Sequence, residues 1–278
     1  MSVRRLCAVA LALSLVACAF IPAVPPYSDA SRAERLQQLL PADIILLGEQ
    51  HDAPDHQQVH RVVVETLASK NSLAALALEM ASQGQSTAGL SRDATEDVVR
   101  QALQWNNEGW PWSAYGPTVM AAVRAGVPVV GANLPSNQLR NVMARTELDA
   151  LLTGPALKAQ QQNIRTGHCD MLPESQIVPM TRVQIARDIA MADTLARAVQ
   201  AGKTVVLLAG GGHVDRSLGV PLHLTPGVKV KAVLIRPEIQ VDLSDPESAA
   251  NFDAIWPAQP APVVDYCAKF SASRRSPT

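Results

Sequence analysis

The sequence lacks an excess of charge of either sign. Its 278 residues include 24 Lys and Arg against 25 Asp and Glu, which gives a formal net charge of −1. It also has no basic stripe with interleaved aromatic residues, and Phe, Trp and Tyr make up only 4% of the chain. Nucleic acids attract proteins through concentrated positive charge. These absences therefore argue against a nucleic-acid-binding role.

The chain also lacks internal repeats. Hydrophobic residues make up 47% of the sequence and charged residues 18%, a balance that is typical of a globular protein with ample material for a core. The length predicts one large domain, or one domain with a subdomain.

Cysteine is scarce, with four residues, and the first two lie in an N-terminal segment. A charged "MSVRR" precedes the apolar run "LCAVALALSLVA", which has signal-peptide length and is too short for a stable membrane span. The run ends in "LVAC", which resembles the lipobox of bacterial lipoproteins. We therefore predict a signal peptide at 1–17, lipidation of Cys18 and a Pro-rich tether at 18–32. An ordinary signal peptide with a chance cysteine is the alternative.

Lipidation would anchor the protein in the bacterial cell envelope, because several acyl chains on one cysteine hold a protein stably at a bilayer. Ala19, and not Asp, follows the cysteine, and we expect attachment to the outer membrane with the protein facing the periplasm. At the C-terminus, we predict that residues 271–278 form a disordered tail.

Two cysteines remain after this assignment, Cys169 and Cys267, because Cys7 lies in the signal peptide. Thiols in an oxidising compartment commonly pair, so we predict a disulfide between them. Two buried free thiols are the alternative.

Short apolar runs alternate with helical patterns between residues 33 and 270, which predicts one α/β domain with a mostly parallel sheet and helices on both faces. The expected strands are "DIILL", "LAALALE", "VPVVGAN", "KTVVLLAGGGH", "VKVKAVLI" and a last one at "APVVDY". Two stretches without strand patterns, about 83–117 and 135–175, predict a smaller helical subdomain.

Polar residues follow several of these strands. The first delivers Glu49 and His51 in "GEQH", the second ends at Glu79, the third at Asn133, and the fourth delivers His213 in "GGGH". Because ligands of open α/β sheets bind beyond the carboxyl ends of the strands, we expect these side chains to lie together.

Such a group has three possible roles. His51, His213 and Glu49 could bind a divalent metal ion and, with Glu79, support hydrolysis through a metal-bound water. Alternatively, histidine and carboxylate could act as base and orienting partner without metal, or the residues could be structural caps and ion pairs. His56 and His60 fall on one face of the following helix, and we interpret them as surface residues.

Several segments together resemble the ChaN-like haem-binding uptake lipoproteins, a family in a superfamily with the Tiki proteases, TraB proteins and erythromycin esterases. The resemblance covers roughly Leu39 to Ile235. The segments that carry it are "ILLGEQHDAPDHQQVH", "LALEM", "GVPVVGANLP", "IRTGHC", "VQIARDIAMADTL" and "LLAGGGHVDRSLGVPLHL".

The resemblance implies haem binding between two subunits of a homodimer, with tyrosine as the iron ligand, a role in iron uptake, and an outer-membrane haem receptor as a possible partner. Tyr27 lies in the tether, which leaves Tyr115 as the tyrosine candidate; packing against Trp105, Trp110 and Trp112 is the alternative role for that ring. His168 is a second candidate, as iron ligand or propionate partner. No C-x-x-C-H motif is present, so spacing alone does not indicate haem. A metal-dependent hydrolase built on Glu49, Glu79 and His213 is the alternative function.

Overall fold

The computed structural model describes residues 25–237 and 250–268. The predicted signal peptide, Cys18, the first part of the tether and the predicted tail lie outside these residues. Within them, no helix combines the length and the apolar character needed to cross a membrane.

Six strands form one sheet in the order β3-β2-β4-β1-β5-β6, and every pairing is parallel. The strands are β1 (Ile44–Glu49), β2 (Leu73–Ser82), β3 (Val129–Asn133), β4 (Thr204–Gly210), β5 (Val230–Pro237) and β6 (Ala254–Ala258). Successive side chains of β1 enter different cores: Ile45 and Leu47 belong to one, and Ile44 and Leu46 to the other. A strand buried on both faces reads as a continuous apolar run, which is why the sequence pattern is so clear.

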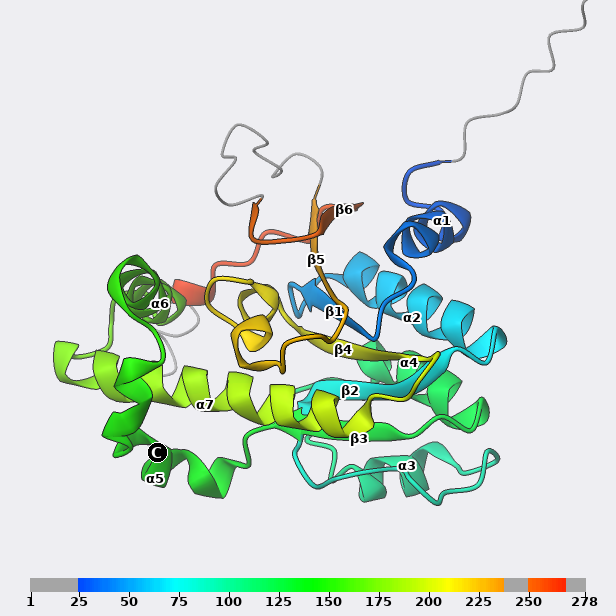
Figure 1. Cartoon of the computed structure of the whole chain (residues 1–278), viewed down its shortest axis with the longest axis horizontal. Helices are drawn as coiled ribbons and strands as arrows, with labels where there is room; N and C mark the ends of the chain where they lie inside the picture. Colours follow the sequence, from blue (N-terminus) through cyan, green and yellow to red (C-terminus); the bar gives the residue numbers. More distant parts are fainter. Residues whose placement is uncertain (1–24, 238–249, 269–278) are drawn as a thin grey trace, which may run out of the picture.

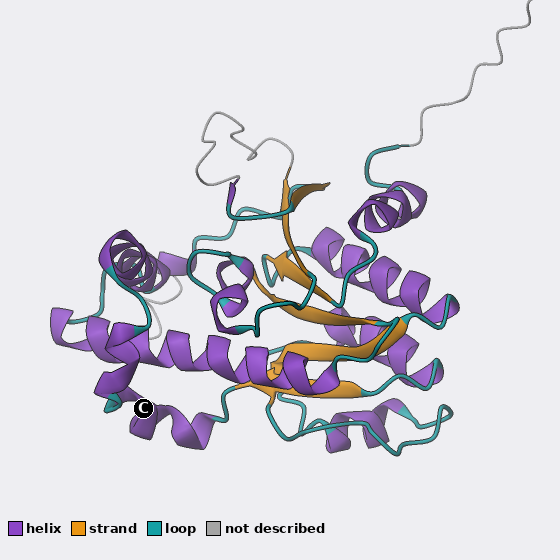
Figure 2. Cartoon of the chain, viewed as in Figure 1, coloured by secondary structure: helices purple, strands orange, loops and turns teal. Residues whose placement is uncertain are grey.

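Helices cover both faces of the sheet, as Figure 1 and Figure 2 show. On one face lie α1 (Asp29–Leu39), α2 (Pro54–Ser69), α3 (Glu96–Ala102) and α4 (Trp112–Arg124). On the other lies the long helix α7 (Glu174–Ala198), whose Met191 and Leu195 enter the second core. The predicted α/β architecture is therefore confirmed.

The two predicted inserts do not form one subdomain. The first, with α3, packs Val99 and Leu103 into the main core. The second contains α5 (Leu139–Met143), α6 (Gly154–Gly167) and two short 3₁₀ helices, η1 (Ser136–Gln138) and η2 (Thr146–Ala150). It builds a small core of its own with the first half of α7, around Val142, Leu148 and Val183. The smaller helical unit is thus the second insert alone.

Two predicted element boundaries are wrong. The last strand is β6, not "APVVDY"; it lies at the edge of the sheet and contains Pro257, which conceals its strand pattern. Helix α1 begins at Asp29, inside the predicted tether. Its cap is Ser28, whose side chain accepts a hydrogen bond from the Ser31 amide.

Candidate functional site

The candidate site lies where β1 and β4 end side by side, with Glu49 opposite Gly210 in the parallel register. Here the 3₁₀ helix η3 (Gly211–Val214) folds back against β1. A Cβ atom on Gly48 would stand 2.4 Å from a Val214 methyl group and 3.0 Å from the Gly211 Cα. Glycine at position 48 therefore allows the two Gly-x-x-His segments to approach each other.

Glu49 organises the first half of the site. Its Oε1 lies 2.7 Å from His51 Nδ1 and accepts a hydrogen bond of 2.6 Å from the Tyr115 hydroxyl. Burial alone would lower the pKa of His51, but the hydrogen bond to Glu49 and the charges of Glu79 and Glu49 raise the pKa above its usual value. His51 is therefore oriented by a carboxylate, as a histidine with a chemical role commonly is.

His213 organises the second half, between two carboxylates. Its Nδ1 lies 2.5 Å from Asp188 Oδ1, and its Nε2 lies 3.4 Å from Glu79 Oε1. All three residues are buried. Burial opposes a charge on His213, yet Glu79 and Asp188 raise its pKa to about 10. His213 is therefore an imidazolium at neutral pH.

Glu79 joins the two halves. Its Oε2 accepts a hydrogen bond of 2.7 Å from the Gly210 amide and lies 3.8 Å from His51 Nε2. Burial would raise the pKa of Glu79, but His213 and His51 outweigh it and lower the pKa to about 2. The structure thus brings together the four residues singled out from the strand ends, which we call the strand-end cluster: Glu49, His51, Glu79 and His213. Glu79 itself lies within β2, not at its end.

Sequence reasoning missed Asp188. This residue lies on α7 and is 1% exposed, three positions after the buried Ile185 and three before the buried Met191. An acid on the apolar face of an amphipathic helix was the available signal, because buried carboxylates need a partner. Burial raises the pKa of Asp188 to about 6, and contact with His213 offsets only part of that effect.

The predicted divalent-metal site is not supported. Among residues 25–237 and 250–268, no three His, Cys, Asp or Glu side chains are arranged to hold a metal ion. The atoms that would bind a metal ion already have other partners. His213 has a carboxylate beside each ring nitrogen, and Glu49 and Glu79 accept hydrogen bonds from Tyr115 and Gly210.

The interpretation of His56 and His60 as surface residues is wrong. They are 0% and 1% exposed. His56 Nδ1 accepts a 3.0 Å hydrogen bond from the Gln50 amide, and His60 Nδ1 lies 3.5 Å from Glu49 Oε2. Burial lowers the pKa of His60 to about 4, so its ring is neutral. Helical spacing placed the two rings on one face but did not say that this face points to the sheet.

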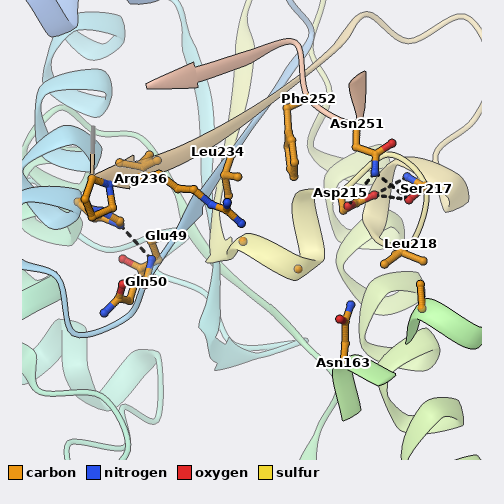
Figure 3. A pocket seen from close by; sticks show the side chains of 16 residues that line it. Glu49, Gln50, Asn163, Asp215, Ser217, Leu218, Leu234, Arg236, Asn251 and Phe252 are labelled. Atoms are coloured by element: carbon orange, nitrogen blue, oxygen red, sulfur yellow. Dashed lines mark hydrogen bonds between the residues drawn. The ribbon is translucent and has the colours of Figure 1, made fainter. Parts of the chain in front are cut away.

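Two cavities flank the cluster. One of about 640 Å³ is lined by His51 and Glu79. The other, of about 710 Å³, is lined by Glu49 and Gln50 (Figure 3). Its opposite side carries a hydrogen-bonded group of Asp215, Ser217 and Asn251. The strand-end cluster can therefore be reached from two sides.

Tyr115 is packed and not presented to a ligand. Its side chain is buried, its ring lies 6.0 Å from that of Trp105 and 6.1 Å from that of Trp110, and its hydroxyl is bonded to Glu49. Burial and the Glu49 charge raise the pKa of the phenol far above its usual value, which disfavours a phenolate. The ring thus has the packed surroundings of the alternative role, and iron ligation by Tyr115 stays a prediction.

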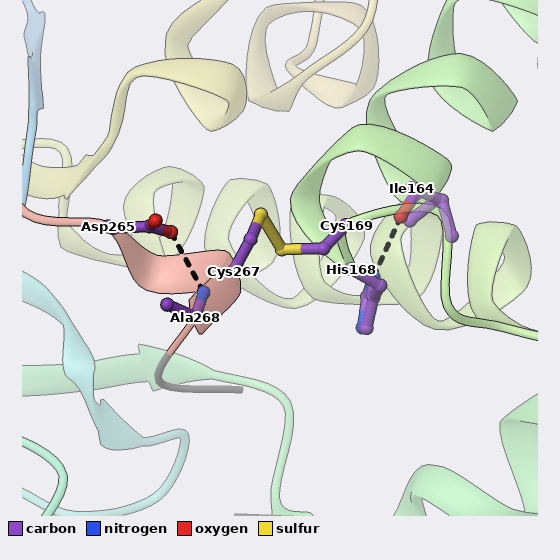
Figure 4. The surroundings of a disulfide bond; sticks show 6 residues. All are labelled: Ile164, His168, Cys169, Asp265, Cys267 and Ala268. Carbon is purple, nitrogen blue, oxygen red and sulfur yellow. Dashed lines mark hydrogen bonds between the residues drawn. A yellow bond between two sulfur atoms is a disulfide. The ribbon is translucent and has the colours of Figure 1, made fainter. Parts of the chain in front are cut away.

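His168 is the C-cap residue of helix α6 and lies beside the disulfide (Figure 4). Its Nδ1 lies 2.8 Å from the Ile164 carbonyl oxygen. Because a carbonyl only accepts, Nδ1 is the donor in this contact. The next residue, Cys169, forms a disulfide with Cys267, which ties α6 to a segment 98 residues further along the chain. The ring of His168 is thus held on an ordered, half-buried helix end.

The fold and cluster define a parallel α/β protein with two Gly-x-x-His turns at neighbouring strand ends. Residues 35–224 match the model of the family described as "Haem-binding uptake, Tiki superfamily, ChaN". The match covers more than half of the chain, so the protein belongs to this family, as the resemblance predicted. No curated protein sequence shows significant similarity to the chain.

Solved structures similar to the chain are also known. The chain is similar to ChaN of Campylobacter jejuni, solved with cofacial heme binding, at 25% identity and a TM-score of 0.62, over 74% of this chain and 86% of that one. The type III effector HopBA1 follows at 15% identity and a TM-score of 0.49, over 74% and 83%. A mutant erythromycin esterase EreC in its open conformation has 16% identity and a TM-score of 0.43, over 73% and 72%.

Proposed function

We propose that this protein binds haem and assists haem or iron uptake. The observation that supports the proposal best is membership of the haem-binding uptake family, together with the similarity to a ChaN protein that binds haem cofacially. Cofacial binding in that relative also favours the expectation that this chain forms a homodimer when it holds haem.

We assign the iron ligand to His168 in preference to Tyr115. Histidines that bind iron or other metals generally donate the second ring N–H to a carbonyl or carboxylate, which fixes the tautomer and the ring orientation. His168 makes that bond with the Ile164 carbonyl. Tyr115, by contrast, would have to leave Glu49 and its buried site before it could reach iron.

Lipid attachment at Cys18 and an outer-membrane position facing the periplasm remain part of the proposal, and the "LVAC" segment supports them. Such a position would hold a haem carrier near an outer-membrane haem receptor. Metabolic labelling with a fatty acid tests the anchor: the wild type should incorporate label and Cys18→Ser should not. Label in both proteins would contradict lipidation at this cysteine.

A haemin titration tests the haem proposal. The soluble chain from Ala19 onward is titrated with haemin and followed by absorbance. We expect a saturable Soret shift in the wild type, its loss or a strong weakening in His168→Ala, and its retention in Tyr115→Phe. His223→Ala is the matched control, because His223 is also a half-buried histidine but lies on a different element, η4 (Val220–His223). The absence of a saturable shift in the wild type would contradict haem binding.

A second candidate function is hydrolysis by His51 as a general base, without metal. One observation favours it: His51 lines the cavity of about 640 Å³ while its other nitrogen is held by Glu49. Glu79 would then stabilise the positive charge that His51 gains when it accepts a proton, and His213 would hold Glu79 in place. Hydrolysis of a chromogenic ester that His51→Ala abolishes would support this function. Equal rates in the wild type and His51→Ala would contradict it.

A further inference from the structure

The cavity of about 640 Å³ beside His51 has an unusual cation on its wall. It lies among the ends of β2 and β3, the segment after α3, and α7, which contributes Arg187. Its other walls include apolar side chains, and Trp110 packs edge-on against His51 with ring centroids 4.7 Å apart. The apolar lining residues are Met80, Ala81, Leu103, Trp110, Leu134 and Leu139.

Arg187 has no hydrogen-bonded or salt-bridged carboxylate among the residues that the structure describes. Among the described residues it forms no salt bridge and its Nε is buried without a hydrogen-bond acceptor. Its neighbour on the same helix, Arg182, instead forms two hydrogen bonds to Asp149, of 2.7 and 2.6 Å. A half-buried guanidinium without a carboxylate is costly, and its flat set of donors matches an anion with two oxygens in one plane.

We propose that this cavity binds a small organic monocarboxylate, with Arg187 receiving the carboxylate and the apolar wall receiving the organic body. The proposal is independent of haem binding, because His168 does not line this cavity.

The charges of the cavity favour one negative charge over two. Arg187 is the only Lys or Arg among its lining residues, whereas Glu79, which also lines it, is ionised. A phosphate dianion would meet the repulsion of that carboxylate and find one cation to offset it. Phosphate sites usually add several backbone N–H groups or further cations. A monocarboxylate needs only the one guanidinium.

The apolar wall favours an organic body over a bare anion such as formate. Leu134, Leu139 and Trp110 supply surface against which a ring or chain can pack, and burial of that surface adds to affinity. 3-Phenylpropionate is a suitable probe, since it joins a carboxylate to a flat apolar body. Its neutral isostere, 3-phenylpropionamide, keeps the shape and loses the charge.

Ligand-observed NMR and calorimetry test the proposal on the soluble chain from Ala19 onward. We expect saturable binding of 3-phenylpropionate with a dissociation constant of about 1 mM, as suits a probe of this size. Arg187→Met should weaken this binding about tenfold, and the amide should bind about tenfold more weakly to the wild type. Inorganic phosphate should not compete.

Arg197→Met is the matched control, because it removes a positive charge from the same helix at a residue that does not line the cavity. It should bind the probe as the wild type does, and melting curves should show that both variants fold. Three results would overturn the proposal: no saturable binding to the wild type, equal affinity for acid and amide, or equal affinity in Arg187→Met and the wild type.

Discussion

Two regions of the molecule carry histidines with candidate roles, and they are built in opposite ways. Glu49, Glu79 and His213 of the strand-end cluster are buried, whereas His51 is partly exposed. His213 lies between the carboxylates of Asp188 and Glu79. The end of α6 is half-buried, its His168 ring bonds the Ile164 carbonyl, and a disulfide joins it to Cys267.

This difference suggests that the cluster contributes to the stability of the fold and that the α6 end contributes to haem binding. A buried charge network that loses a member leaves its partners unpaired, so the cluster must be kept intact for the fold to survive. A flat ligand such as haem needs accessible surface beside its iron ligand, and the half-buried α6 end carries the candidate histidine. We therefore expect substitutions in the two regions to affect different properties.

The largest loss of unfolding free energy should come from His213→Ala. The change leaves Asp188 and Glu79 buried without their cation, and breaking such a pair costs about 3–5 kcal/mol of unfolding free energy. His168→Ala should cost only about 1 kcal/mol, because this side chain is half-buried and its removal leaves no buried charge unpaired. Urea unfolding followed by circular dichroism measures both. A similar loss in the two variants would refute the division between the regions.

The second effect concerns the disulfide. Replacing both Cys169 and Cys267 by serine should lower the unfolding free energy by about 2–4 kcal/mol, since the bond restricts an unfolded loop of 98 residues. Haemin affinity should also fall, because His168 adjoins Cys169, whereas binding of 3-phenylpropionate should not change. If the double variant binds haemin as tightly as the wild type, the disulfide does not help to position His168.

The third effect is the dependence of the unfolding free energy on pH. Burial lowers the pKa of His60 in the folded state to about 4, so the unfolded chain binds this proton first and stability falls as pH drops from about 6.5 to about 4. The pKa of His213 is raised to about 10, so its contribution is complete below about 6.5 and is lost as pH rises towards 10. Stability should therefore be greatest near pH 6.5.

His60→Phe isolates the acid side of this curve. The variant should lose stability less steeply between pH 6.5 and 4, by up to about 1.4 kcal/mol per pH unit, which is the linkage of one proton. Unfolding free energies of the two proteins at several pH values make the comparison. An unchanged acid slope would show that His60 does not titrate as its burial requires.

The sheet could be predicted from the sequence because parallel strands buried on both faces leave continuous apolar runs, as β1 and β4 do. The edge strand β6 could not, because it is short and contains Pro257. The gathering of His51 and His213 followed from topology alone, since neighbouring parallel strands end at one edge.

The residues that contact these histidines could not be predicted from the sequence. Asp188 comes from α7, and its rotation about the helix axis decides whether it meets His213 or solvent. The same rotation decides the burial of His60 on α2. Tyr115 was placed correctly beside the tryptophans, but its bond to Glu49 depends on how α4 docks on the sheet.

The most direct test of the account compares the two regions in one experiment. Haemin affinity is measured by Soret titration for His168→Ala and for His51→Ala, with the wild type alongside. The account predicts that His168→Ala loses saturable binding while His51→Ala keeps wild-type affinity. Loss of binding in His51→Ala with retention in His168→Ala would place the haem ligand in the strand-end cluster and contradict the account.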